Sequence, residues 1–137
     1  MNVFLDTNVV IDLLGERKPY YDDAIIIVEM HKTGLIHIVV STLTIVNCAY
    51  IIRKAYSEKI MLEKVKKLCD TFEITAVDRV AIMQAIHNGG HDFEDSVQYF
   101  SSLPCKPDVI VTRDKHGFDG FNIMVMTPSE FIAESRK

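Results

Sequence analysis

Five short apolar runs alternate with longer helical segments along the whole chain, and this alternation restricts the fold more than any other feature. Each run is about four residues long and mostly apolar, which is typical of strands buried on both faces of a sheet. We predict strands at Asn2–Leu5, His37–Val40, Phe72–Thr75, Asp108–Val111 and Ile123–Met126. Strand–helix alternation with right-handed crossovers predicts an α/β fold: a three-layer α/β/α sandwich around a central, mainly parallel five-stranded sheet.

The segments between these runs carry helix start and stop signals. Asp78 and Asp92 are typical N-cap residues, and Ser41 or Thr42 can cap another helix. Glycines and prolines mark several of the ends. The predicted helices cover residues 8–14, 19–34, 42–56, 59–70, 78–88, 92–103 and a short segment from 128.

Length and charge narrow the class of protein. The chain has 137 residues, 48% of them hydrophobic, with no repeat or linker, so we expect a single domain over 1–137. The net charge of −4 argues against a generic basic nucleic-acid binder, which neutralises phosphates with Lys and Arg. The negative net charge does not exclude an enzyme that binds phosphates through a metal ion.

The three cysteines are far apart, at positions 48, 69 and 105, and have neither zinc-like spacing nor a disulfide framework. No apolar run approaches the roughly 18 to 20 residues that span a bilayer. We expect no signal peptide before Asp6. We therefore expect a cytoplasmic protein with reduced thiols and no membrane contact.

Carboxylates follow the ends of two predicted strands. Asp6, in VFLDTN, ends the first strand, and Asp114, in VTRD, follows the fourth, with Thr112 beside it. In open parallel sheets, ligands bind beyond the carboxyl ends of the strands. If the first and fourth strands are neighbours, these groups converge on one rim. The helix leading into the fourth strand adds three more acids there, namely Asp92, Glu94 and Asp95.

Several carboxylates in one place repel each other and stay ionised only if a cation lies among them. Oxygen ligands favour a hard ion such as Mg²⁺ or Mn²⁺ over zinc. In proteins such an ion usually holds a phosphate oxygen and activates water. The residues thus predict a metal-dependent phosphate chemistry.

Three motifs together resemble the PIN domain family. They are LDTNVVIDLL at the start, DSVQYF after the middle, and VTRDKHGF followed by MVMTPSEF near the end, in matching order and spacing. The chain is most similar to bacterial single-domain PIN proteins of the VapC type, many of them toxins of toxin–antitoxin pairs. The resemblance implies an α/β/α sandwich and an endoribonuclease that hydrolyses RNA phosphodiesters with Mg²⁺ or Mn²⁺. It also implies a homodimer and an antitoxin protein as partners.

The resemblance also assigns residues. It implies that Asp6, Asp95 and Asp114 are catalytic and hold the metal, with Asp92 as a further ligand. The residues implied to support them are Asn8, Asn47, Thr112 and Glu94.

One position departs from the family pattern. The helix after the second strand, STLTIVNCAYIIRK, has Asn47 where the family usually has a glutamate. Asparagine offers a neutral carbonyl oxygen, and fewer ligand charges normally mean weaker cation binding. Either Asp92 or Glu94 compensates, or the site holds one ion loosely, or activity is lost.

Two other classes of protein compete with a nuclease. A haloacid-dehalogenase-like phosphatase also has an Asp after its first strand, but it needs a second Asp two residues on, where this chain has Asn8. A PIN-like module with weakened or no catalysis, binding RNA or a protein partner, stays open because of Asn47.

Several residues also have simpler interpretations. Asp6 alone could be a helix N-cap, and we interpret Asp12 as a solvated helix residue. His91 and His116 lie near the predicted rim, and we interpret both as loop residues. The candidates for contacting RNA phosphate are Arg53, Arg113 and Lys115.

Overall fold

Five strands form one sheet in the computed structural model, which describes residues 1–137. The strands are β1 (Asn2–Leu5), β2 (His37–Ser41), β3 (Glu73–Thr75), β4 (Val109–Val111) and β5 (Met124–Met126). Their order across the sheet is β3-β2-β1-β4-β5, and every neighbouring pair is parallel. The predicted, mainly parallel five-stranded sheet is thus confirmed, and all of its strands are parallel.

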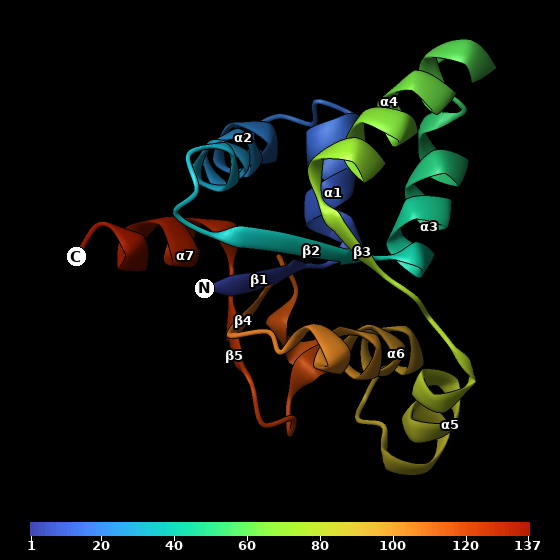
Figure 1. The fold of residues 1–137 in the computed structure, drawn as a ribbon, viewed down its shortest axis with the longest axis vertical. Coiled ribbons are helices and arrows are strands. Elements are labelled where there is room, and N and C mark those ends of the chain that lie inside the picture. Colours follow the sequence, from blue (N-terminus) through green and yellow to red (C-terminus); the bar gives the residue numbers. More distant parts are fainter.

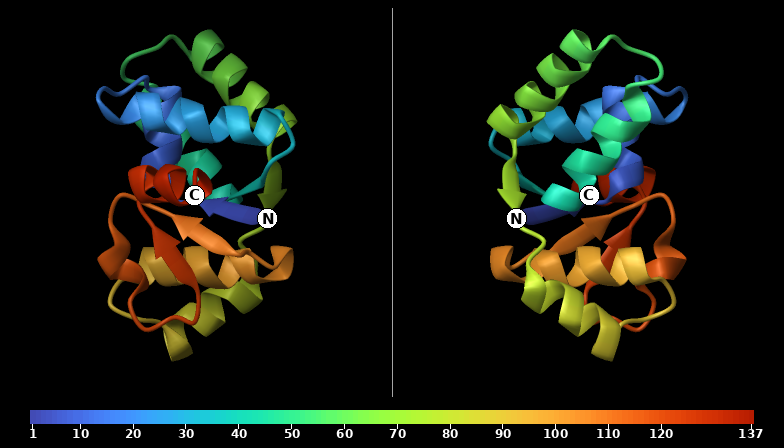
Figure 2. Two further views of the ribbon diagram at one scale, coloured as in Figure 1. Left: turned by 90° about the vertical axis from the view of Figure 1, so that its left-hand side faces the viewer. Right: turned by 90° about the vertical axis from the view of Figure 1, so that its right-hand side faces the viewer.

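Seven helices cover the two faces of this sheet. They are α1 (Thr7–Leu14), α2 (Tyr20–Lys32), α3 (Thr42–Ile52), α4 (Glu58–Thr71), α5 (Arg79–Asn88), α6 (Phe93–Ser102) and α7 (Pro128–Ser135). Helices α1 to α4 and α7 lie on one side of the sheet, and α5 and α6 lie on the other (Figures 1 and 2). This arrangement confirms the predicted α/β/α sandwich.

The core follows from the alternation of side chains along the buried strands. In β1, Val3 and Leu5 point to the helix layer of α1 to α4 and α7, within a cluster of 20 buried residues. Phe4 points to the opposite face, where it packs with Val39, Ile110 and Phe118. Successive side chains of a strand point to opposite faces, so an all-apolar strand serves both layers.

Most helices begin at the predicted caps. The side chain of Ser41 accepts a hydrogen bond from the backbone of Thr44, and Asp78 and Asp92 cap α5 and α6 in the same way. Helix α3 ends at Ile52 rather than near residue 56, because residues 53–56 form the turn that leads to Ser57, the N-cap of α4.

No helix in the structure is both long enough and apolar enough to span a bilayer.

The strand order places the ends of β1 and β4 side by side. Leu5 lies opposite Val111 in the parallel register, and the backbone N–H of Asp6 donates to the carbonyl of Val111 at 3.0 Å. The residue after β1 and the residues after β4 therefore share one edge of the sheet.

Candidate active site

Asp6 is a buried carboxylate at the junction of β1 and α1, with only 4% of its surface exposed. It is the N-cap of α1, and its Oδ1 accepts a hydrogen bond from the backbone N–H of Thr7 at 2.8 Å. Its Oδ2 accepts one from the hydroxyl of Thr112 at 2.8 Å. Burial raises the pKa of Asp6, while the hydrogen bond from Thr112, then those from Thr7 and Gln98, act against this rise.

Asn8 and Thr112 tie the start of α1 to the loop after β4. The amide Nδ2 of Asn8 donates to the hydroxyl oxygen of Thr112 at 3.1 Å. Its Oδ1 accepts from the backbone N–H of Arg113 at 3.1 Å. Asn8 thus contacts the segment that leads to Asp114. The hydroxyl of Thr112 also accepts from the backbone N–H of Asp114 at 3.1 Å, and together these bonds fix where Asp114 begins the short 3₁₀ helix η2 (Lys115–Phe118).

The start of α6 approaches the same edge from the opposite layer. Asp92 caps α6 by accepting a hydrogen bond from the backbone N–H of Asp95 at 2.9 Å, so the two acids lie one helical turn apart. The carboxylate of Asp95 lies against Gly117 of η2, in the space that a side chain at position 117 would take. Glycine at 117 therefore allows α6 and η2 to approach closely.

These segments enclose a cavity of about 430 Å³. Its lining contains five acidic side chains, only two apolar ones, and two arginines, Arg17 and Arg113. The acids are Asp6, Asp92, Glu94, Asp95 and Asp114. The structure thus brings together all five acids that the sequence analysis placed at the rim, at the carboxyl ends of β1 and β4.

Burial and the neighbouring acids disturb the ionisation of Asp95 and Glu94. Burial raises the pKa of Asp95, and the negative charges around it raise it further, to about 7. Those charges belong, in decreasing order of effect, to Asp6, Asp92, Glu94 and Asp114. Burial likewise raises the pKa of Glu94, helped by Asp6 and Asp92. A cation among these oxygens would relieve the repulsion, so the residues fit a hard divalent metal ion.

Asp12 is buried, so its interpretation as a solvated helix residue was wrong. It is 1% exposed and not solvated, because Arg113 Nε donates to its Oδ2 at 2.7 Å and Arg17 Nε lies 3.7 Å from its Oδ1. A buried carboxylate needs such partners. Arg113 also stacks on Tyr20, with its guanidinium carbon 4.0 Å from the ring centre. Arg113 therefore already balances Asp12. With Arg17 as the other cation of the lining, the five rim acids keep an excess of negative charge.

Four predicted site residues lie outside the cavity lining, although one of them, Thr112, bonds Asp6. Asn47 is partly buried on α3, and Ile51, one turn further along that helix, lines the cavity. Arg53 is the C-cap of α3, with its guanidinium 3.8 Å from the ring centre of Tyr50. Lys115 pairs with Glu130 at 3.0 Å. Of the three cations predicted to contact RNA phosphate, only Arg113 borders the acids.

Gln98 and Arg17 are site residues that the sequence analysis missed. Gln98 is fully buried, and its Nε2 lies 3.3 Å from Asp6 Oδ1 and 2.7 Å from Thr44 Oγ1. Asp95 and Gln98 are three positions apart on α6, so they lie on one helix face. That spacing is the signal that could have identified Gln98, while nothing in the sequence singles out Arg17.

The parallel sheet of order 3-2-1-4-5 and the acidic cavity at its edge define an α/β/α protein with a candidate cation site. Residues 2–116 match the PIN domain family, so the chain belongs to that family. No curated protein matches the sequence.

Solved structures share the fold at low sequence identity. A toxin–antitoxin complex from Klebsiella pneumoniae aligns at a TM-score of 0.67 and 18% identity, over 92% of this chain and 97% of that chain. VapC20 from Mycobacterium tuberculosis, described as a sarcin–ricin loop cleaving toxin, aligns at 0.66 and 12%, over 87% and 95%. VapBC2 from Rickettsia felis, bound to a promoter DNA fragment, aligns at 0.63 and 13%, over 92% and 97%.

Proposed function

We propose that this PIN domain is a metal-dependent endoribonuclease that hydrolyses RNA phosphodiester bonds, in the manner of the VapC-type toxins that it resembles. One observation carries the proposal: five carboxylates from three separate segments line one cavity and outnumber its two arginines. Such an arrangement costs stability unless a cation is bound, and PIN domains typically use a divalent metal.

In this proposal Asp6, Asp95 and Asp114 hold Mg²⁺ or Mn²⁺, with Asp92 as a further ligand. Bound there, the ion supplies stabilisation of charge on the phosphate and a lower pKa for the attacking water. Asp6 is kept in place by the hydroxyl of Thr112 and the backbone N–H of Thr7. Preset hydrogen bonds of this kind hold a ligand ready without reorganisation.

The rim offers a place for the RNA backbone as well. The Arg17 side chain is half-exposed and its closest ion pair, with Asp12, is 3.7 Å long, so its guanidinium retains capacity for a phosphate. Arg113 is held more firmly, by two contacts to Asp12 at 2.7 and 3.3 Å. We therefore assign phosphate contact to Arg17 first and a positioning role to Arg113.

Asn47 favours the alternative of a catalytically weakened or inactive module that binds RNA or a protein. Against it, Asp92 and Glu94 both line the cavity, so the loss of one family carboxylate leaves five acids in place. This supports the nuclease over the inactive module.

The test is incubation of the protein with single-stranded RNA and Mn²⁺. Asp6→Asn is expected to reduce the cleavage rate by at least about 100-fold, because a bound metal contributes several kcal/mol of charge stabilisation. Asp70→Asn, which changes an exposed carboxylate on α4 paired only with Lys66, is the matched control and should cleave like the wild type. Equal cleavage by Asp6→Asn and wild type, or no cleavage by the wild type, would count against the proposal.

We also propose an antitoxin protein and a second copy of this chain as partners, since solved relatives occur in toxin–antitoxin complexes. Co-expression with the product of an adjacent reading frame, followed by size-exclusion chromatography, tests both. A monomer that binds no such product would contradict this part of the proposal.

A further inference from the structure

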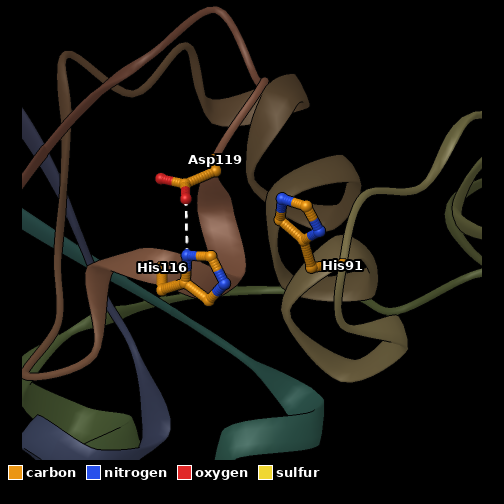
Figure 3. A group of neighbouring side chains, drawn as sticks. All are labelled: His91, His116 and Asp119. Carbon is orange, nitrogen blue, oxygen red and sulfur yellow. Dashed lines mark hydrogen bonds and ion pairs between the residues drawn. The ribbon is translucent and has the colours of Figure 1, made fainter.

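A second group of metal-binding side chains lies outside the acidic cavity. His91, His116 and Asp119 are all exposed, and each offers one ligand atom within 4.8 Å of the other two. Figure 3 shows His116 and Asp119 close together on one segment, with His91 facing them from the loop before α6. The imidazole rings of the two histidines stack, with centres 4.9 Å apart, and His116 Nδ1 lies 2.6 Å from Asp119 Oδ2.

Backbone packing holds these segments together. A side chain at Gly90, next to His91, would begin 3.3 Å from the carbonyl oxygen of Asp119 and 3.6 Å from the ring of Phe121. The N–H of Gly90 donates to Ser96 Oγ at 3.0 Å, which anchors the loop to α6. The meeting of the two histidines therefore follows from a close contact between two backbone segments, and not only from the orientation of flexible side chains.

The ligand chemistry differs from that of the acidic cavity. Two imidazoles and one carboxylate suit zinc and its neighbours, whereas oxygen-only sites suit Mg²⁺ and Mn²⁺. Ligand atoms of a tetrahedral zinc site lie about 3.3 Å apart, given Zn–N distances of about 2.0–2.1 Å. The ligand atoms of His91, His116 and Asp119 lie within 4.8 Å of one another, and rotation of these exposed side chains can bring them to the shorter zinc-site distance.

We propose that His91, His116 and Asp119 bind a transition-metal ion of the zinc class, with three protein ligands and an open position for water. His91 directly precedes Asp92, and His116 lies two positions after Asp114. A metal ion here ties the start of α6 to η2, the two segments that carry the acids other than Asp6. Metal binding itself does not depend on nuclease activity; only an effect on catalysis would rest on the proposed function.

Titration calorimetry with ZnCl₂ on the tag-free full chain tests the site. The wild type is expected to bind one Zn²⁺. His91→Ala and His116→Ala should each weaken this binding by at least about tenfold, since the loss of an outer-shell partner already costs about 10–100-fold in metal affinity. His87→Ala, at the exposed end of α5, is the matched control and should bind like the wild type.

Asp6→Asn separates the two metal sites. Zinc affinity that survives Asp6→Asn but falls in both histidine variants supports the proposal. No zinc binding by the wild type, unchanged affinity in either His91→Ala or His116→Ala, or loss of zinc only in Asp6→Asn would each overturn it. Each of these results is independent of whether the protein cleaves RNA.

Discussion

Replacing Gln98 by leucine is expected to lower the free energy of unfolding by about 3 kcal/mol, because it removes several buried hydrogen bonds, each worth about 0.5–1.5 kcal/mol. Gln98 is fully buried, and its amide lies 2.7 Å from Thr44 Oγ1, 3.1 Å from Thr7 Oγ1 and 3.3 Å from Asp6 Oδ1. Its Oε1 accepts from the hydroxyl of Ser41. Leucine is of similar size but can satisfy none of these groups.

Urea unfolding followed by circular dichroism measures this effect. Gln84→Leu, an exposed position on α5, is the matched control and should change the free energy of unfolding by less than about 0.5 kcal/mol. If Gln98→Leu unfolds as the control does, the hydrogen bonds of Gln98 to Asp6, Ser41 and Thr44 do not stabilise the fold.

Gly117→Ala is expected to reduce RNA cleavage by about 100-fold while leaving the fold intact, because positioning errors near 1 Å cost about that much. The new methyl carbon would occupy the position of the Asp95 carboxylate and lie 2.7 Å from Asp95 Cγ. Asp95 must then turn away from its present position beside η2. The effect on catalysis should greatly exceed the effect on stability, since the obstacle is the end of one side chain.

A double-mutant cycle identifies the cause. In an Asp95→Ala background, Gly117→Ala should reduce cleavage little further, because the carboxylate that it displaces is already absent. Multiplicative losses from the two changes would show that Gly117 acts by some other route.

The strands and helices of this fold could be predicted from the sequence because the patterns that indicate them are local. Short apolar runs such as HIVV predicted the strands, and N-cap residues such as Asp78 and Asp92 predicted the helix starts. The convergence of the acids depended on one further fact, the pairing of β1 with β4, which no local pattern contains.

Contacts between distant segments could not be predicted in this way. Asp12 was expected to be solvated, but its partner Arg113 is 101 positions away and reaches it only once β4 is in place. Gln98 meets Asp6 across 92 positions. The stacking of His91 on His116 depends on the packing of the loop before α6 against η2, a 3₁₀ helix where the sequence predicted a loop. Spacing within one helix carries no information about such pairs.

Asn47 lies on the face of α3 that is turned toward the site. Thr44, one turn before it, bonds Thr7 at 2.9 Å, and Ile51, one turn after it, lines the cavity. Residues three and four apart share a helix face, so a longer acidic side chain at 47 is expected to reach the carboxylate rim. Val46, which is 66% exposed, points elsewhere on the same helix.

Calorimetric titration of Mn²⁺ tests the central claim, a cation site built by the rim acids, most directly. The wild type should bind Mn²⁺, Asp6→Asn should lose at least about tenfold in affinity, and Asn47→Glu should gain about threefold or more, since ligand charge sets cation affinity. Val46→Glu, the matched control, should bind like the wild type. Equal Mn²⁺ affinity in wild type and Asp6→Asn, or no binding by either, would contradict the account.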